Sequence, residues 1–395
     1  MGHRSRTVAE QRSIGGSGKD ATALRRIVIS SFDNPTHPHY NGGGVTMIEM
    51  MADRLSTDFE VTIVTSGSRG ATPAQDRIRY RTLPIGWAGP RTGQLLYHML
   101  LPVFMQRIPH DLWIENFTPP FSTSFLPLFT RARIVGFAQS LCGKEMSVRY
   151  RLPFFLIERL GLRFYRDVVV LNSADQELVR RYSPSASVHL IPNGIRIGNL
   201  NERTVGKGDH ILFLGRIDVW KKGLDMLLAA YEKSGVSMPL IIAGSGVPRE
   251  ERKLLDLLAA TTGDVRWVGH VSGEHKQDLL ERSAFMVMPS RYETFGLTAL
   301  ESMCLGKPVL HFDLPTLDWM NGDVRTAPYE VSTLADQIRH LTNDDVARQE
   351  LGRTAYKAAQ RYSYDDTGDR YITLVQELLD AALTQAEVGD ASLRR

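Results

Sequence analysis

The sequence has little cysteine, little net charge and no long apolar run. Its 395 residues hold two cysteines, Cys142 and Cys304, which excludes a disulfide framework and a CxxC metal motif and fits a reducing cytoplasm. Lys and Arg total 47 against 44 Asp and Glu, and the resulting net charge of +3 is too small to indicate a nucleic-acid partner. The longest apolar stretch, Leu95 to Met105, is interrupted by Pro102 and is too short to span a bilayer. Because no apolar run precedes Ile27, we expect no secretory signal.

What the chain does contain is an alternation of apolar runs and amphipathic stretches. Hydrophobic residues make up 43% of the sequence and charged residues 23%, as in a globular protein, and the length suffices for two domains. We expect helices over residues 45–55, 224–231, 297–305 and 365–383. Short apolar runs predict strands at residues 26–31, 60–65, 77–80, 111–115, 133–137, 168–172, 188–191, 210–214, 239–243, 265–268, 284–288 and 308–312.

This order of elements predicts an α/β protein with two facing Rossmann-like domains, each a doubly wound parallel sheet. We expect a disordered arm over residues 1–23, an N-terminal domain over 24–195 and a second domain over 208–363. A C-terminal helix over 364–385 would return toward the N-terminal domain. Ligands bind beyond the carboxyl ends of the strands in such sheets, so the two domains would define a cleft between them.

Two glutamates flank the start of a predicted helix. Glu293 lies in the loop after the strand at 284–288, and Glu301 lies more than one turn inside the helix that begins near Gly296. The free N–H groups at a helix N-terminus favour an anionic ligand such as a diphosphate, and the two carboxylates would reach hydroxyls on either side of it. Taken alone, the pair is also what two solvated or capping glutamates would look like.

Loops after other strands carry cations and glycines. Arg216 and Lys222 lie on either side of one loop and could both reach a single diphosphate, although two solvated surface cations would have the same spacing. A triple glycine at 42–44, which includes Gly43 and Gly44, precedes the helix expected at Val45 and permits close approach to a phosphate or forms a flexible turn.

These residues resemble the donor-site motifs of the retaining, GT-B glycosyltransferases of family 4 (glycosyltransferase group 1). The resemblance is carried by "GRIDVWKKG", which holds Arg216 and Lys222, and by "PSRYETFGLTALESMCLGKPVL", which holds Glu293 and Glu301. Further similar segments are "NGGGVTMIEMMADRLSTDFEVTIVTSG" and "VVVLNSADQELVRRY", the latter followed by "VHLIPNGI". The similarity extends from about Arg26 to about Leu383.

The resemblance implies a role for each matching position. Arg216, Lys222 and Glu293 would be the catalytic set: the two cations would hold the diphosphate and stabilise its charge as it leaves, and Glu293 would bind hydroxyls of the transferred sugar. Glu301 would bind the ribose. The other positions implied to bind the nucleotide sugar are Gly43, Gly44, Val271, Phe295, Gly296, Leu297 and Thr298.

The resemblance also implies that a nucleoside diphosphate sugar is the donor substrate, with no separate cofactor and no metal, since cations and helix dipoles replace the metal of other classes. Members often have a histidine where this chain has Gln139, after the strand at 133–137. Gln139 can hydrogen-bond a sugar hydroxyl but cannot act as an acid or base. A retaining mechanism does not need one there, because the departing phosphate can take the acceptor proton.

The residues that would bind the acceptor are harder to identify from the sequence. Eight basic residues and only two acids, Glu145 and Glu158, lie between Arg131 and Arg166, interleaved with apolar side chains. We favour a helix packed on the sheet with a solvated basic face. The alternative is a membrane-surface patch or a site for a phosphate-bearing lipid acceptor, which would place a cytoplasmic protein peripherally at the inner membrane face.

We therefore expect a hexosyltransferase that acts on an acceptor hydroxyl of a glycan, glycolipid or secondary metabolite. One alternative is a GT-B sugar-nucleotide epimerase, which requires N-terminal acids and histidines. Another is a nicotinamide-dependent oxidoreductase with two Rossmann-like domains, which predicts GxGxxG directly after the first strand, whereas ten residues separate Ser31 from the glycines here. A silent sugar-nucleotide-binding protein is the last alternative.

Overall fold

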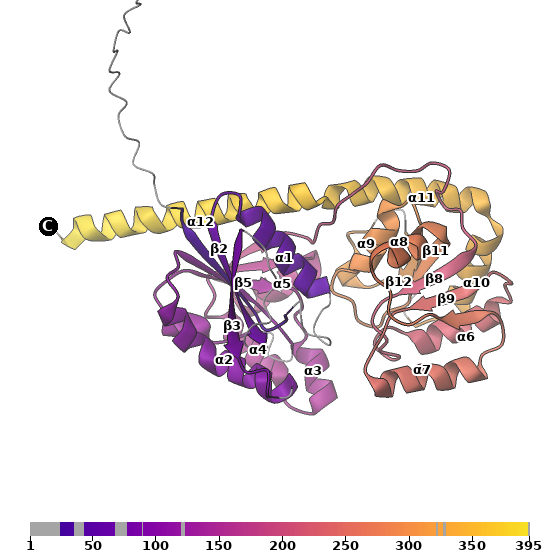
Figure 1. Ribbon diagram of the computed structural model, residues 1–395, viewed down its shortest axis with the longest axis horizontal. Helices are drawn as coiled ribbons and strands as arrows, with labels where there is room; N and C mark the ends of the chain where they lie inside the picture. Colours follow the sequence, from indigo (N-terminus) through magenta and orange to yellow (C-terminus); the bar gives the residue numbers. More distant parts are fainter. Residues whose placement is uncertain are drawn as a thin grey trace, which may run out of the picture.

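The structure, a computed structural model, describes residues 24–34, 43–67, 77–88, 90–119, 123–320, 323–326 and 329–393. The predicted arm over 1–23 and Gly42 lie outside these residues. Figure 1 shows two α/β halves side by side, joined by a long C-terminal helix. Every helix among the described residues is too short or too polar to cross a membrane.

The first half is built on a parallel sheet of seven strands in the order β3-β2-β1-β4-β5-β6-β7. β1, β4, β5 and β6 are buried along almost their whole length, as expected for parallel strands covered by helices on both faces. The strand bounds are β1 (Arg26–Ser31), β2 (Glu60–Gly67), β3 (Ile78–Pro84), β4 (Leu112–Asn116), β5 (Ile134–Ala138), β6 (Asp167–Val170) and β7 (Ser187–Leu190).

Helices cover both faces of this first sheet. On one face, α1 (Gly43–Leu55) and α12 (Tyr364–Leu393) pack on side chains such as Ile29 and Val135. The opposite face, which includes Val28 and Ile134, carries the other elements. These are α2 (Pro90–Arg107), η1 (Leu126–Phe129), α3 (Gly143–Tyr150), α4 (Phe154–Leu162) and α5 (Ser173–Tyr182).

The second half holds a parallel sheet of six strands in the order β10-β9-β8-β11-β12-β13. Its strands are β8 (His210–Leu214), β9 (Leu240–Ala243), β10 (Val265–Trp267), β11 (Ser283–Met288), β12 (Val309–Phe312) and β13 (Val324–Thr326). The helices are α6 (Leu224–Ser234), α7 (Pro248–Ala260), α8 (Gly273–Arg282), α9 (Leu297–Cys304), η2 (Pro315–Leu317), α10 (Val331–Asn343), α11 (Asp345–Ala359) and η3 (Gln360–Tyr362). Both sheets together confirm the predicted architecture of two parallel-sheet α/β domains.

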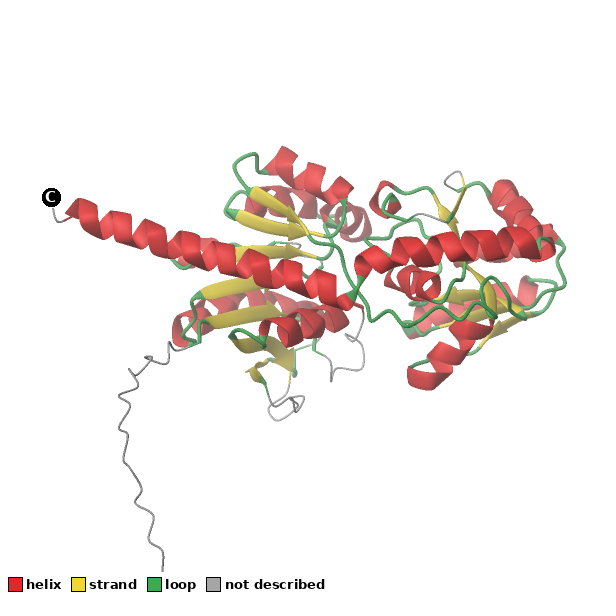
Figure 2. Ribbon diagram, turned by 90° about the horizontal axis from the view of Figure 1, so that it is seen from above, coloured by secondary structure: helices red, strands yellow, loops and turns green. Residues whose placement is uncertain are grey.

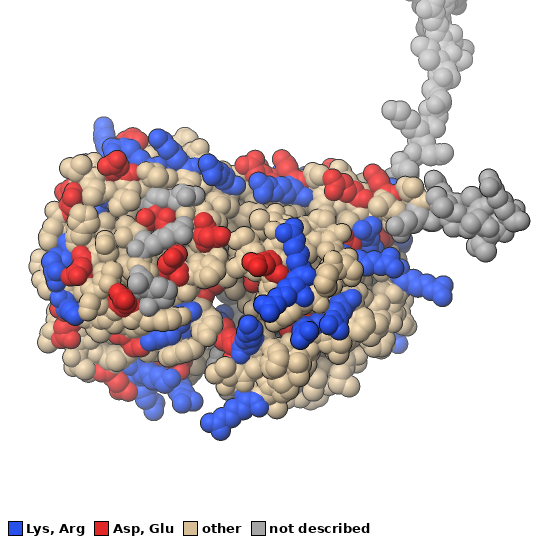
Figure 3. Space-filling view, turned by 180° about the vertical axis from the view of Figure 1, so that it is seen from behind, with Lys and Arg blue, Asp and Glu red and all other residues tan. Residues whose placement is uncertain are grey.

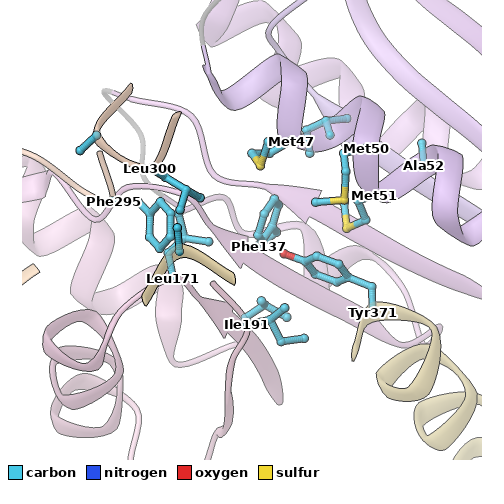
Figure 4. Packing of buried hydrophobic residues seen from close by; sticks show 14 of the residues in the cluster. Met47, Met50, Met51, Ala52, Phe137, Leu171, Ile191, Phe295, Leu300 and Tyr371 are labelled. Carbon is cyan, nitrogen blue, oxygen red and sulfur yellow. The ribbon is translucent and has the colours of Figure 1, made fainter. Parts of the chain in front are cut away.

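The C-terminal helix α12 starts beside the second half and runs across the first (Figure 2). Its Tyr371 ring packs edge-on against Phe137, with ring centroids 5.9 Å apart, and Figure 4 shows both rings beside Met51 of α1. Midway along the helix, Arg133 donates a hydrogen bond of 3.2 Å to the carbonyl oxygen of Leu378. The final helix therefore closes the core of a domain that was otherwise complete about 170 residues earlier.

Several predicted bounds differ from the observed ones, by two to ten residues. α1 begins at Gly43, two residues before the expected Val45, and α12 runs to Leu393 instead of Leu383. β6 ends at Val170, because Asn172 leaves the strand to cap α5, where its side chain accepts a hydrogen bond from the N–H of Asp175. The largest addition is α2, an 18-residue helix that contains the stretch noted above only for its apolar character.

Candidate functional site

The carboxyl ends of both sheets face one another, and polar contacts cross between them. The side chain of Asn172 donates a hydrogen bond to the carbonyl oxygen of Thr294 (2.9 Å), and Ser173 donates one to Asp318 (2.7 Å). Farther along, the amine of Lys221 lies 2.9 Å from both carboxylate oxygens of Glu145 on α3. The loops after β8 and β11 therefore sit directly against the first half.

Lys222 and Glu293 form an ion pair at the centre of this boundary, and both are largely buried. Two loops meet tightly here: Gly223 has a left-handed φ of 68°, and a Cβ on it would lie 2.0 Å from the carbonyl oxygen of Pro289. The N–H of Arg291 also donates to the carbonyl oxygen of Lys221 (2.9 Å). Only glycine fits at position 223, so the sequence KKG itself brings the lysine to the glutamate.

The ion pair keeps Glu293 negatively charged. Burial alone would raise the pKa of Glu293, but the charge of Lys222 and the hydrogen bond from it together bring that pKa below its ordinary value. The N–H of Thr294 adds a hydrogen bond of 3.3 Å to the second carboxylate oxygen. An ionised, buried carboxylate beside a cation can accept hydrogen bonds from ligand hydroxyls on its remaining lone pairs.

The helix that follows begins as predicted. Gly296 is the N-cap of α9, with a left-handed φ of 79°, and Leu297 is the first helical residue. Phe295 anchors the turn, because its ring is buried and stacks on Trp319 with centroids 4.5 Å apart and planes 7° apart. The indole N–H of Trp319 donates to the carbonyl oxygen of Phe295 (3.0 Å). The turn thus holds the first N–H groups of the helix, including that of Thr298, at the boundary between the two halves.

Glu301 occupies a separate position on α9. Its Oε1 accepts a hydrogen bond of 2.8 Å from Lys276 on α8, while its buried Oε2 has no hydrogen-bond partner among the described residues. Val271, in the loop before α8, is buried with the core. The two glutamates of the motif therefore have different cationic partners, and the sequence did not identify Lys276 as one of them.

Across the boundary, the glycines at the start of α1 lie against the second half. A Cβ on Gly43 would lie 2.6 Å from Cδ1 of Leu297, so two predicted donor-site residues from opposite halves adjoin. The side-chain amide of Gln139 donates to the carbonyl oxygen of Gly44 (3.0 Å), and a Cβ on Gly44 would lie 2.7 Å from Gln139 Oε1. Gln139 therefore fixes the first turn of α1, with its amide turned toward the helix start.

A carboxylate that the sequence reasoning missed lies at the same place. Asp33 follows β1, and its Oδ2 would be 3.8 Å from a Cβ on Gly44. Burial raises the pKa of Asp33 to about 6, and the positive charge of Arg216, an exposed residue after β8, offsets part of this shift. The position of Asp33 two residues beyond a predicted strand was the available signal. Among the described residues, no three His, Cys, Asp or Glu side chains are grouped so that they could hold a metal ion.

Comparison with known protein families gives two matches that lie end to end. The model described as Glycosyltransferase Family 4 matches residues 41–198, and the one described as Glycosyl transferases group 1 matches residues 201–358. The second match contains the ion pair, the start of α9 and Glu301. The first contains Gly43, Gly44 and Gln139.

Individual proteins are similar over parts of this chain. A glycogen synthase of Mycobacterium tuberculosis (strain ATCC 25618 / H37Rv) is 31% identical over 208 residues, which are 49% of this chain and 48% of that protein. The chain thus spans about half the length of this curated relative.

Solved structures share the fold over most of the chain. The sucrose-phosphate synthase (tll1590) from Thermosynechococcus elongatus superposes with a TM-score of 0.74 over 90% of this chain and 100% of that one, at 18% identity. The Anabaena protein Alr3699/HepE, solved in complex with UDP and glucose, superposes with a TM-score of 0.68 over 89% of this chain and 100% of that one, at 16% identity. At such low identity, these likenesses show a common arrangement of two facing sheets.

Proposed function

Because the chain belongs to the group 1 glycosyltransferases of the GT-B fold, we propose that it moves a hexose from a nucleoside diphosphate sugar to an acceptor hydroxyl. The observation that carries the proposal is the buried pair of Lys222 and Glu293 beside the N-terminus of α9. This arrangement combines a cation for a diphosphate, a carboxylate for sugar hydroxyls and a helix end that favours anions. The comparisons give no support to an epimerase, an oxidoreductase or a silent binding protein.

In this proposal the donor lies along the second half of the cleft. Arg216 and Lys222 hold the diphosphate, and Glu293 accepts hydrogen bonds from the sugar. Glu301 binds the ribose through its buried Oε2, and the backbone near Val271 meets the base. Gly43 and Gly44 let the first half approach the phosphates, opposite the turn at residues 295–298. The crystal of the Anabaena protein with UDP and glucose supports UDP as the first nucleotide to test.

We propose that transfer retains the configuration of the sugar and needs no metal. The bond between sugar C1 and the phosphate oxygen breaks, the acceptor oxygen bonds to C1 on the same face, and the acceptor proton passes to the departing phosphate oxygen. Arg216 and Lys222 stabilise the negative charge that builds on the diphosphate during this step. The chain then supplies no general base, and Gln139 has a positioning role at the start of α1.

The experiment is a thermal-shift panel with UDP-glucose, other UDP-sugars and GDP-mannose, followed by measurement of nucleoside diphosphate release with EDTA present. A matching donor stabilises the folded state according to its occupancy. We expect one nucleotide class to raise Tm and that donor to be hydrolysed slowly in EDTA. The product anomer, read by NMR once an acceptor is found, tests retention. A strict requirement for a divalent metal contradicts the proposed chemistry.

A further inference from the structure

Large apolar side chains are unusually exposed on one part of the first half. Of the twenty-one large hydrophobic residues that are exposed among the described residues, eleven lie between Leu95 and Leu160. They all belong to, or directly follow, the elements that cover one face of the first sheet: α2, η1, α3 and α4. We call this set the outer apolar patch. Single exposed apolar residues are normal on a protein surface, whereas many of them on one face indicate an interaction surface.

The patch begins on α2. Leu95, Met99 and Val103 recur every four residues, so they form one stripe along the helix, and they are 44–65% exposed. Leu101 and Met105, on the opposite side of the same helix, are buried in the core. The helix is therefore apolar on both sides, although only one of them packs against other described residues. It contains no aspartate or glutamate.

The patch continues over the neighbouring elements. Leu128 and Phe129 end η1, which packs beside α2. On α4, Phe155, Leu156 and Leu160 are 38–49% exposed, whereas Leu162 points into the core. The remaining members are Leu100 on α2, and Val148 and Leu152, in and after α3. α3 carries Glu145, which binds Lys221 of the second half, so the patch reaches the boundary between the two halves.

The charges around the patch are almost all positive. Exposed basic residues border it, namely Arg107, Arg131, Lys144, Arg151, Arg159, Arg163 and Arg166. Figure 3 shows lysine and arginine side chains gathered on the half of the molecule built on the first sheet, with few carboxylates between them.

The acids of the same region are sequestered. Between residues 90 and 166, Glu115 and Glu158 are buried, Glu145 binds Lys221, and Asp111 pairs with Arg26. No described carboxylate in this range is thus left exposed and unpaired.

We propose that the outer apolar patch docks on the surface of a bilayer with anionic headgroups. Apolar side chains ringed by cations fit the boundary between acyl chains and negatively charged headgroups, where both contribute to binding. The location takes up the alternative given for residues 131–166, a membrane-surface patch, over the solvated basic face that the sequence favoured. The basic segment supplies the charge, and α2, which that alternative did not include, supplies much of the apolar contact. Docking in this way places the cleft edge near α3 close to the lipid surface. It requires no bound donor, so it is independent of the function proposed above.

The test is co-sedimentation of the full chain with vesicles of phosphatidylcholine alone or mixed with phosphatidylglycerol. We expect binding to the mixed vesicles that weakens as salt rises, since salt screens the arginines. The double variant Met99→Glu, Leu156→Glu should bind at least about tenfold more weakly, because two insertions are lost and two repulsive charges are gained. The matched control is Leu255→Glu, Val346→Glu, which changes two exposed apolar residues of the second half and should bind like the natural protein.

Circular dichroism and Tm check that both double variants are folded. Equal binding of the two variants, or no preference of the natural protein for anionic vesicles, overturns the proposal. Light scattering measures the oligomeric state in solution, and we expect a monomer. A dimer that Met99→Glu, Leu156→Glu dissociates would mean that a second copy of the chain covers the patch, and it would likewise overturn the proposal.

Discussion

Lys222 and Glu293, 71 residues apart in the chain, are hydrogen-bonded to each other while both side chains are largely shielded from water. Two loops that follow neighbouring strands of the second sheet, β8 and β11, make this contact, and Gly223 allows the loops to touch. The pair serves the fold and the proposed chemistry at once, so substitutions must be designed to separate the two.

Lys222→Ala should reduce both activity and stability. Removing a group that stabilises developing charge typically costs about 10²–10³-fold in rate. It also leaves Glu293 buried without its cation, which should lower the free energy of unfolding at pH 8 by roughly 1–3 kcal/mol. The pKa of Glu293 in the folded chain lies below its ordinary value of 4.5. The ion pair therefore stabilises the folded state above about pH 4.5, and this stabilisation is lost as the pH falls below that value. Urea unfolding at pH 4 and pH 8 measures the difference.

The double variant Lys222→Ala, Glu293→Gln is the control for that experiment. It removes both charges and keeps the shape of the glutamate side chain, so most of the lost stability should return while activity stays low. If the double variant remains as unstable as Lys222→Ala, the uncompensated charge of Glu293 is not the cause.

Glu293 and Glu301 should differ in kinetic effect. Glu293 is assigned to the sugar that moves, so Glu293→Gln should lower kcat by about 10²-fold or more. Glu301 is assigned to the ribose, which stays with the nucleotide. Glu301→Gln should therefore act mainly on the KM for the donor, by about tenfold, the cost of one weakened charge-assisted hydrogen bond. Steady-state rates of donor hydrolysis provide both constants, and a loss confined to kcat for Glu301→Gln argues against its assignment.

Glu115 should make stability depend on pH. This residue is buried on β4, with Tyr165 donating a hydrogen bond of 2.5 Å to its Oε2, and burial raises its pKa to about 7 from 4.5. Between these pH values the folded chain keeps a proton on Glu115 that the unfolded chain has already lost. The contribution of Glu115 to stability is therefore largest below pH 4.5 and is lost as the pH rises through 7. Glu115→Gln should remove this fall and gain roughly 1–3 kcal/mol at pH 8 relative to pH 5.

Denaturant unfolding of the natural chain and of Glu115→Gln, at both pH values, tests this prediction. Glu177→Gln on the exposed side of α5 is the matched control and should leave the pH dependence unchanged. The prediction is contradicted if the natural chain and the Glu177→Gln control are both as stable at pH 8 as at pH 5.

Gly43→Ala should weaken donor binding more than it weakens the fold. The new methyl group would lie 2.6 Å from Cδ1 of Leu297, which must then turn away or push the two halves apart. Alanine is otherwise favourable at a helix start, so we expect a change in unfolding free energy within about 1 kcal/mol and a Kd for the donor raised about threefold to tenfold. Isothermal titration with the donor found in the thermal-shift panel measures it. Gly198→Ala, where a Cβ meets nothing within 4 Å, is the control.

The strands were predictable because buried parallel strands appear as continuous apolar runs, and β8 matches its expected bounds at both ends. α2 was not predicted, because apolar side chains on both of its sides, with Pro102 inside the helix, hide the helical period. The motif residues near Lys222 and Glu293 follow from local sequence. Asp33, Lys276 and the contact of Gly43 with Leu297 do not, since each depends on how distant segments or separate halves come together.

The two connections between the halves also have a mechanical consequence. The outgoing chain at Ile195 and the returning chain at Ser363 form a parallel bridge: the N–H of Ile195 donates to Tyr362 (3.0 Å) and the N–H of Tyr364 donates to Ile195 (2.8 Å). Gly194 permits this approach, since a Cβ there would lie 2.5 Å from the carbonyl oxygen of Ser363. Any motion of one half relative to the other must therefore bend both connecting segments together, because they are hydrogen-bonded to each other. α12 would move with the first half, on which it packs.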